Sequence, residues 1–248
     1  MLKSILCLCV VSFILFSCAP NNIDNPSVPV IITEETGNEK KNYIDDITFL
    51  GESTTYHLKS RGVLSDGKNT KQVWAPKSGT LMLDASIGDC RIIYPDSQKE
   101  ISLEEALKLK KPKMMLLTFG LNGATGFISR GESYFKFCYQ KLIDMIKKSS
   151  PETEIIINSC YPIAKNMNMI HYTVDAKTLN SYIDTINQWA KSLAEENALI
   201  FTNSASALKD SDGYLSKNLQ AEDGYHLNAE AYKAILKYLN KEIQKHLT

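Results

Sequence analysis

The chain has 248 residues, of which 44% are hydrophobic, enough for one sizeable core, so a single folded domain is the simplest expectation. Lysine and arginine together number 28, as do aspartate and glutamate, and this balance provides no overall field that would draw the protein to nucleic acid. The sequence also lacks the spaced histidines and cysteines that are typical of transition-metal sites.

The first 17 residues are typical of a bacterial export signal. Lys3 supplies a positive charge, and residues 6–16 form an apolar run that is too short to span a bilayer stably. The run ends in Leu15-Phe16-Ser17-Cys18, which resembles the lipobox of bacterial lipoproteins. The resemblance implies that Cys18 becomes the lipidated first residue of an extracytoplasmic protein, anchored to the bacterial cell membrane. The alternative is an ordinary secretory signal in which Cys18 has no role.

Residues 18–44 are predicted to be a flexible tether, which leaves residues 45–248 as the folded domain. The tether segment is rich in Asn, Pro, Glu, Thr and Lys and has no sustained apolar periodicity, so it cannot bury enough surface to become ordered. Three cysteines follow it, Cys90, Cys138 and Cys160. Their odd number argues against a disulfide framework, and the sequence leaves open whether two of them pair.

From Asp45 onwards, short apolar runs alternate with amphipathic ones. The apolar runs predict five strands, at 47–50, 81–86, 114–119, 154–158 and 198–201. The amphipathic runs predict five helices, at 53–59, 103–110, 134–148, 176–195 and 229–246. The alternation predicts an α/β fold in which a mainly parallel five-stranded sheet lies between two layers of helices, a three-layer α/β/α sandwich.

Three positions that follow predicted strands are small or polar. Ser53 comes after the first strand, Gly88 after the second and Asn122 after the third. Because α/β proteins bind their ligands at the carboxyl ends of parallel strands, we expect these three residues to converge at one edge of the sheet.

Ser53 allows two interpretations. Serine is a preferred helix cap, so it can simply begin the helix that follows the first strand. It can also be a nucleophile, which needs a base to take its proton and a third group to orient that base. Near the C-terminus, Asp223 and His226 are three residues apart, and the glycine between them allows a tight turn that would bring the carboxylate to the ring. Taken alone, these two residues also fit a simple turn before the last helix.

Four short blocks make residues 45–248 resemble the SGNH, or GDSL-type, hydrolases. The blocks are Gly51-Glu52-Ser53, Ser86-Ile87-Gly88-Asp89, Gly120-Leu121-Asn122 and Asp223-Gly224-Tyr225-His226, and they occur in the order of the family. The resemblance implies a flavodoxin-like fold. It also implies a serine esterase that works through an acyl-enzyme and needs no cofactor or metal.

The resemblance implies a role for each matching residue. Ser53 would be the nucleophile, His226 the general base and then acid, and Asp223 its orienting partner. The backbone N–H groups of Ser53 and Gly88 and the side-chain amide of Asn122 would form the oxyanion hole. Such donors stabilise the negative charge that develops on the carbonyl oxygen.

Two positions depart from the pattern of the family. Glu52 stands where an Asp usually precedes the nucleophile, and Gly123 stands where an Asp commonly follows the third block. Both changes are expected to loosen the support of the first and third blocks without removing a catalytic group. His57 lies one helical turn after Ser53 and is interpreted as a helix-surface residue, because a base on the nucleophile's own helix would have poor geometry.

Together these features predict a membrane-anchored serine esterase that works outside the cytoplasm on an ester substrate. Its place at a cell surface favours short acyl groups, such as acetyl esters of a cell-wall or extracellular polysaccharide. A lysophospholipase, a thioesterase or an O-acyltransferase would use the same triad. A surface binding module that has lost turnover would keep the same fold, and the sequence leaves these alternatives open.

Overall fold

The computed structural model describes residues 42–167 and 173–247. The predicted export signal (1–17), Cys18 and nearly all of the predicted tether (18–44) lie outside the described residues. The last residues of that tether belong to the folded domain. They begin a 3-10 helix, η1 (Tyr43–Asp46), in which Tyr43 is buried and its backbone N–H donates to the side chain of Asn240 at 2.8 Å.

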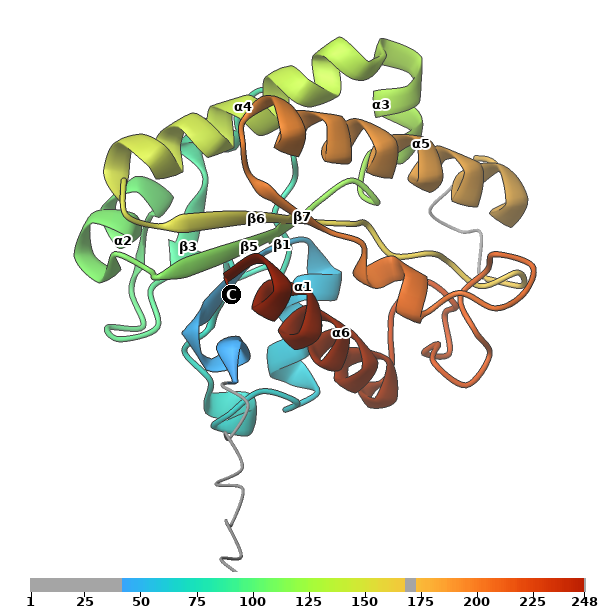
Figure 1. The fold of residues 1–248 in the computed structure, drawn as a ribbon, viewed down its shortest axis with the longest axis horizontal. Coiled ribbons are helices and arrows are strands. Elements are labelled where there is room, and N and C mark those ends of the chain that lie inside the picture. Colours follow the sequence, from blue (N-terminus) through green and yellow to red (C-terminus); the bar gives the residue numbers. More distant parts are fainter. Residues whose placement is uncertain (1–41, 168–172, 248) are drawn as a thin grey trace, which may run out of the picture. The chain divides into compact units, whose positions relative to one another are not determined.

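A parallel sheet of five strands forms the centre of the fold (Figure 1). The strands are β1 (Ile47–Gly51), β2 (Val73–Trp74), β5 (Met114–Thr118), β6 (Glu154–Asn158) and β7 (Ile200–Thr202). They lie in the order β2-β1-β5-β6-β7, and every neighbouring pair is parallel. This is the order of a flavodoxin-like sheet, in which strands are added first on one side of β1 and then on the other. The predicted fold class is confirmed.

Helices cover both faces of the sheet. One face carries α2 (Leu103–Lys110), α3 (Ala124–Arg130), α4 (Glu132–Ser149) and α5 (Ala176–Glu196), and the other carries α1 (Ser53–Ser60) and α6 (Ala229–Leu247) (Figure 1). Successive side chains of β5 point to opposite faces of the sheet. Met115 and Leu117 pack with α2 to α5, and Leu116 packs with α1 and α6. A strand buried on both faces has a continuous apolar sequence, which explains why the central strands could be predicted.

The second strand differs from the prediction. Residues 81–86 form a loop, and the second strand is β2, whose two residues pair with Phe49 and Leu50 of β1. Leu81 and Leu83 are buried although they are not in a strand, so the loop has the alternating apolar pattern that a strand would have. The antiparallel hairpin of β3 (Arg91–Ile93) and β4 (Glu100–Ser102) was not predicted either.

Two asparagines of α5 hold the loop that follows β6. The side chain of Asn180 accepts the Ile163 N–H at 3.0 Å and donates to the Ile163 carbonyl at 3.1 Å. Asn187 pairs in the same way with Cys160, at 2.7 and 3.0 Å. Each amide therefore replaces the two hydrogen bonds that a neighbouring strand would make, and the loop is fixed to α5.

Two further points concern the described residues alone. Cys90, Cys138 and Cys160 are all free thiols, so the question of a disulfide between them is answered for this structure. Within residues 42–167 and 173–247, every helix is too short or too polar to cross a membrane.

Candidate active site

Ser53, His226 and Asp223 are joined by consecutive side-chain hydrogen bonds. The Oγ of Ser53 lies 2.9 Å from Nε2 of His226, and Nδ1 of the same ring lies 2.7 Å from Oδ2 of Asp223. Ser53 begins α1, whereas the other two residues lie in the loop before α6, so only the folded chain brings them together. In this arrangement the histidine can take the proton of the serine while the carboxylate orients the ring.

Close packing at the end of β1 determines the position of Ser53. A Cβ on Gly51 would lie 2.3 Å from Oγ1 of Thr55 and 2.4 Å from the carbonyl oxygen of Thr118, so only glycine fits at this position. The first turn of α1 can therefore approach the sheet closely. This packing explains why a glycine stands two residues before the serine.

Ser53 does not cap its helix. The N-cap position is held by Glu52, which has extended backbone, and Ser53 is the first residue of α1. The hydroxyl group of Ser53 is hydrogen-bonded to His226 instead. The cap interpretation is therefore wrong, and the side chain is presented to the loop before α6.

The loop that carries Asp223 and His226 is tightly folded. Oδ1 of Asp223 accepts the backbone N–H groups of Tyr225 and His226, at 3.0 and 2.8 Å, which leaves Oδ2 for the ring. Gly224 has a φ of +76°, and a Cβ there would lie 2.7 Å from the Cα of Met167. Both the positive φ and the close approach require glycine. The predicted tight turn between the acid and the base is present.

Hydrogen bonds keep Asp223 ionised. Burial by itself raises the pKa of this carboxyl group, but the N–H groups of His226 and Tyr225 and the His226 ring together outweigh burial, so the pKa lies below its ordinary value. The side chains of His226 and Asp223 are 17% and 34% exposed. At neutral pH the carboxylate is therefore charged and stabilises the imidazolium that forms when the ring accepts a proton.

Two neighbouring rings pack against His226. The centroids of the His57 and Tyr225 rings lie 4.4 and 4.2 Å from its centroid. Nδ1 of His57 is buried and has no hydrogen-bond partner among the described residues. Burial, followed by the charges of His226 and Arg61, lowers the pKa of His57 to about 4, so this ring is neutral at neutral pH. The interpretation of His57 as a surface residue is corrected, because it is half-buried against the proposed base.

Glu52 connects the first block to the third. Its Oε1 accepts the backbone N–H groups of Gly120 and Asn122, at 2.9 and 3.1 Å, and its Oε2 also lies 3.1 Å from the Asn122 nitrogen. The residue is 2% exposed. Burial raises the pKa of Glu52 to about 7, although these hydrogen bonds oppose the rise. Glu52 therefore supports the third block through both oxygens of its carboxyl group.

Asn122 lies at this site, whereas Gly88 does not. The Nδ2 of Asn122 donates to Oγ1 of Thr80 at 3.0 Å, and its backbone is held by Glu52, the residue before the nucleophile. Gly88 lies in a 3-10 helix, η3 (Ile87–Asp89), and lines a separate pocket formed with α2 and with the second half of α4. The structure therefore does not bring Gly88 into the predicted oxyanion hole. The reason is that the second strand was predicted at 81–86, whereas in the structure it is β2, which ends at Trp74.

The loop after β2 places a different glycine next to α1. Gly79 is buried and has a φ of +77°, and a Cβ there would lie 3.0 Å from the Tyr56 ring, one helical turn after Ser53. Its neighbour Thr80 accepts the Asn122 amide. Sequence reasoning missed Gly79, although the glycine stands between a serine and a threonine shortly after the apolar Val-Trp pair of β2.

The arrangement can activate a hydroxyl group and stabilise an anion. The N–H of Ser53 lies in the first turn of α1, where such groups have no partner within the helix, and the Asn122 amide has a second N–H beside the one that Thr80 accepts. Among residues 42–167 and 173–247, no group of three or more His, Cys, Asp or Glu side chains is placed to hold a metal ion.

We expect Glu52→Gln to change the pH dependence of stability. The folded-state pKa of Glu52 is about 7 and its ordinary value is 4.5, so the wild type should lose stability as the pH rises from 4.5 to 7, by roughly 3 kcal/mol. Glutamine does not titrate and should not show this loss. Urea unfolding at pH 4.5 and pH 8 measures the difference, with Glu152→Gln, an exposed glutamate, as the matched control. Identical pH dependences in wild type and Glu52→Gln would contradict the prediction.

A family model matches most of the folded domain. The model of the GDSL-like lipase/acylhydrolase family matches residues 49–234, which include Ser53, Asn122, Asp223 and His226. No curated protein has a sequence that matches this chain.

Solved structures share the fold at low sequence identity. The periplasmic domain of a lipopolysaccharide acetyltransferase from Salmonella ser. Paratyphi A has a TM-score of 0.54 at 17% identity, over 83% of this chain and 85% of that one. A GDSL-like lipase from Bacteroides thetaiotaomicron has a TM-score of 0.50 at 13% identity, over 84% and 92% of the two chains. These likenesses show the fold alone. Because the family model covers more than half of the sequence, the chain belongs to the GDSL-like lipase/acylhydrolase family.

Proposed function

We propose that this acylhydrolase is a serine esterase that removes short acyl groups, such as acetyl, from polysaccharides outside the cell. The observation that carries the proposal is the hydrogen-bonded series Ser53–His226–Asp223. Glu52, next to Ser53, accepts the backbone N–H of Asn122. A serine, a base and an orienting acid in this geometry perform acyl transfer in unrelated folds.

The proposed reaction has two halves. The Ser53 oxygen attacks the ester carbonyl while Nε2 of His226 takes its proton, and Asp223 stabilises the resulting imidazolium. The Ser53 N–H and the Asn122 amide donate to the oxyanion. His226 then protonates the leaving alcohol, which leaves an acyl-enzyme. Water, activated by the same ring, releases the acid and restores the serine.

One comparison supports the proposal that the acyl group is short. The Salmonella domain of the same fold belongs to a lipopolysaccharide acetyltransferase. The comparison also favours a second candidate function, acyl transfer to a sugar hydroxyl in place of water. The two functions differ in their product, because only hydrolysis releases the free acid.

The extracytoplasmic location is a further part of the proposal. It rests on the export signal and on Cys18, which follows Leu15-Phe16-Ser17. A lipid on Cys18 would hold the enzyme at the outer side of a bacterial membrane, close to acylated surface polysaccharides.

Metabolic labelling with a palmitate analogue should therefore tag the wild type and fail to tag Cys18→Ser. Cys9→Ser is the matched control, because it removes a thiol from the same segment and should remain labelled. Release of wild type and Cys18→Ser alike as unlabelled protein would leave simple secretion as the explanation.

Ser53→Ala should abolish hydrolysis of p-nitrophenyl acetate, with kcat falling by a factor of roughly 10⁴ or more because the acyl-enzyme cannot form. Circular dichroism should show an unchanged fold. Ser60→Ala alters a hydroxyl group in the same helix and should keep full activity. Activity retained by purified Ser53→Ala would remove this residue from the mechanism.

Asn122→Ala should lower kcat for p-nitrophenyl acetate about 100- to 1,000-fold with a much smaller change in KM, because the amide is needed where charge develops. Gly88→Ala is the matched control. A Cβ on Gly88 meets nothing within 4 Å, and the residue lies outside the site, so both constants should be unchanged. A rise in KM alone for Asn122→Ala would make this residue a binding group, and a large loss in Gly88→Ala would restore the original assignment of the oxyanion hole.

A further inference from the structure

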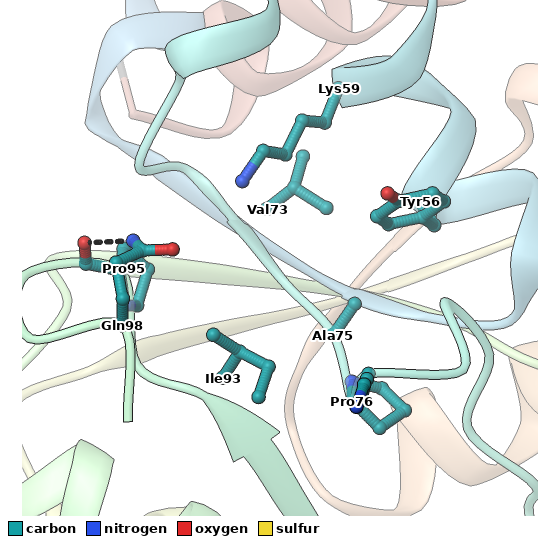
Figure 2. Close-up of a pocket in the computed structure, with 9 residues that line it drawn as sticks. Tyr56, Lys59, Val73, Ala75, Pro76, Ile93, Pro95 and Gln98 are labelled. Atoms are coloured by element: carbon teal, nitrogen blue, oxygen red, sulfur yellow. Dashed lines mark hydrogen bonds between the residues drawn. The ribbon is translucent and has the colours of Figure 1, made fainter. Parts of the chain in front are cut away.

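A pocket of about 220 Å³ lies between α1 and the β3–β4 hairpin, and one of its lining residues, Tyr56, is one helical turn after Ser53 (Figure 2). Val73 and Ala75 from the β2 segment and Ile93 from the hairpin supply apolar surface. Tyr56 and Lys59 border it from α1. The proposed reaction uses none of these side chains, so the pocket is available for another part of the substrate.

Tyr56 connects this pocket to the nucleophile. It lies one helical turn after Ser53, and its ring is next to Gly79, whose neighbour Thr80 accepts the Asn122 amide. Lys59 lies one turn further along α1, and at 1.5 Å per residue its backbone is about 9 Å from Ser53 along the helix axis. A group bound at Lys59 is therefore too far from the ester carbonyl to be a short acyl group. It would belong to a neighbouring unit of a longer substrate.

The pocket has an excess of positive charge. Lys59 and Lys77 line it, and its nine lining residues, all within the described ranges, include no acidic side chain. Neither lysine forms an ion pair with a described residue. Figure 2 shows the ammonium group of Lys59 extending past Val73 towards the hairpin. The whole chain has 28 basic and 28 acidic residues, so this excess is local.

The two acidic residues of the nearby hairpin are paired with other basic residues. Glu100 lies 3.8 Å from the Arg91 guanidinium. Asp96 lies 2.7 Å from the Lys71 ammonium and 3.7 Å from that of Lys110, and it does not line the pocket. The Asp96 carboxylate therefore interacts with Lys71 and Lys110. Lys59 and Lys77 are left to interact with an anion from outside the chain.

The other polar groups of the pocket suit a sugar ring. Nε2 of Gln98 donates to the Pro95 carbonyl at 2.6 Å, which fixes this amide at the rim (Figure 2). The Tyr56 side chain is 36% exposed, so it offers both a flat apolar face and a hydroxyl group.

We propose that this pocket is a subsite for an anionic sugar, one that carries a carboxylate or a sulfate and lies next to the sugar that carries the ester. The substrate class is then an O-acylated acidic polysaccharide. This inference rests on the proposed esterase function and makes the substrate class more specific. Lys59 and Lys77 bind the anion, and Tyr56 contacts the ring that carries it.

The test compares acetylated oligogalacturonides with neutral acetylated xylo-oligosaccharides of the same length. Acetate release is measured for the wild type, for the double variant Lys59→Gln/Lys77→Gln, and for Lys241→Gln, an exposed lysine of α6, as the control. The wild type should have the lower KM for the acidic substrate. The preference is the ratio of kcat/KM for the acidic substrate to kcat/KM for the neutral one. In the double variant this ratio should be roughly 3- to 20-fold smaller, as expected from the loss of two exposed charge pairs. Lys241→Gln should match the wild type.

Salt provides a second measurement. The wild-type preference should weaken as NaCl rises from 10 to 150 mM, because the screening length falls from about 30 Å to about 8 Å. A third substrate, a sulfated and acetylated oligosaccharide, shows whether the subsite prefers sulfate or carboxylate, because the substrate with the preferred anion should have the lower KM. Equal KM values for the acidic and neutral substrates, or a preference that survives the double substitution, would overturn the subsite. Failure of the wild type to hydrolyse even p-nitrophenyl acetate would instead overturn the proposed function.

Discussion

The buried carboxyl group of Glu52 is the interaction on which the candidate site depends. It immediately precedes Ser53 and reaches the backbone of Gly120 and Asn122, so one side chain joins the ends of β1 and β5. These two strands are neighbours at the point where the order of the sheet reverses, the usual place for a ligand in this fold. Burial of the acid is costly, as its pKa of about 7 shows. The hydrogen bonds offset part of this cost and fix the nucleophile relative to the proposed oxyanion donor.

A second set of contacts positions the base. The loop with Asp223 and His226 is joined to the loop after β6, because the Ala164 N–H donates to the Gly224 carbonyl at 2.7 Å. The asparagines of α5 fix the loop after β6 at Cys160 and Ile163. The α6 helix adds a direct connection to α1, because the Tyr232 hydroxyl donates to the Thr54 carbonyl at 2.6 Å. The two halves of the site are therefore built on different parts of the sheet and meet through the Ser53–His226 hydrogen bond.

The fold by itself does not determine what the site acts on. A lipopolysaccharide acetyltransferase domain and a GDSL-like lipase share it at 17% and 13% identity with this chain. In this chain the pocket beyond Tyr56 contains two lysines that form no ion pair within the part of the chain that the structure describes. Our proposal therefore assigns substrate selection to the loops around β2 and the β3–β4 hairpin.

The sequence by itself determined the features that depend on local pattern. Buried strands such as β6 are continuous apolar runs, and the glycines at 51 and 224 indicated turns that only a small residue permits. Tertiary structure decided the features that depend on distant partners. Val73 and Trp74 form a strand because Phe49 and Leu50 pair with them, whereas Leu81 and Leu83 reach the core from a loop. For that reason the sequence indicated Gly88 at this edge of the sheet, whereas in the structure Gly79 is the glycine that lies against Tyr56 of α1.

The same limit applies to single side chains. Glu52 has its partners 68 and 70 residues away, and the ring of His226 packs against the half-buried His57. No local pattern records such contacts, since the backbone reaches them only after the sheet has formed. The residue types at this site could therefore be read from the sequence, but their burial, their charge state and their neighbours were decided by the packing of distant segments.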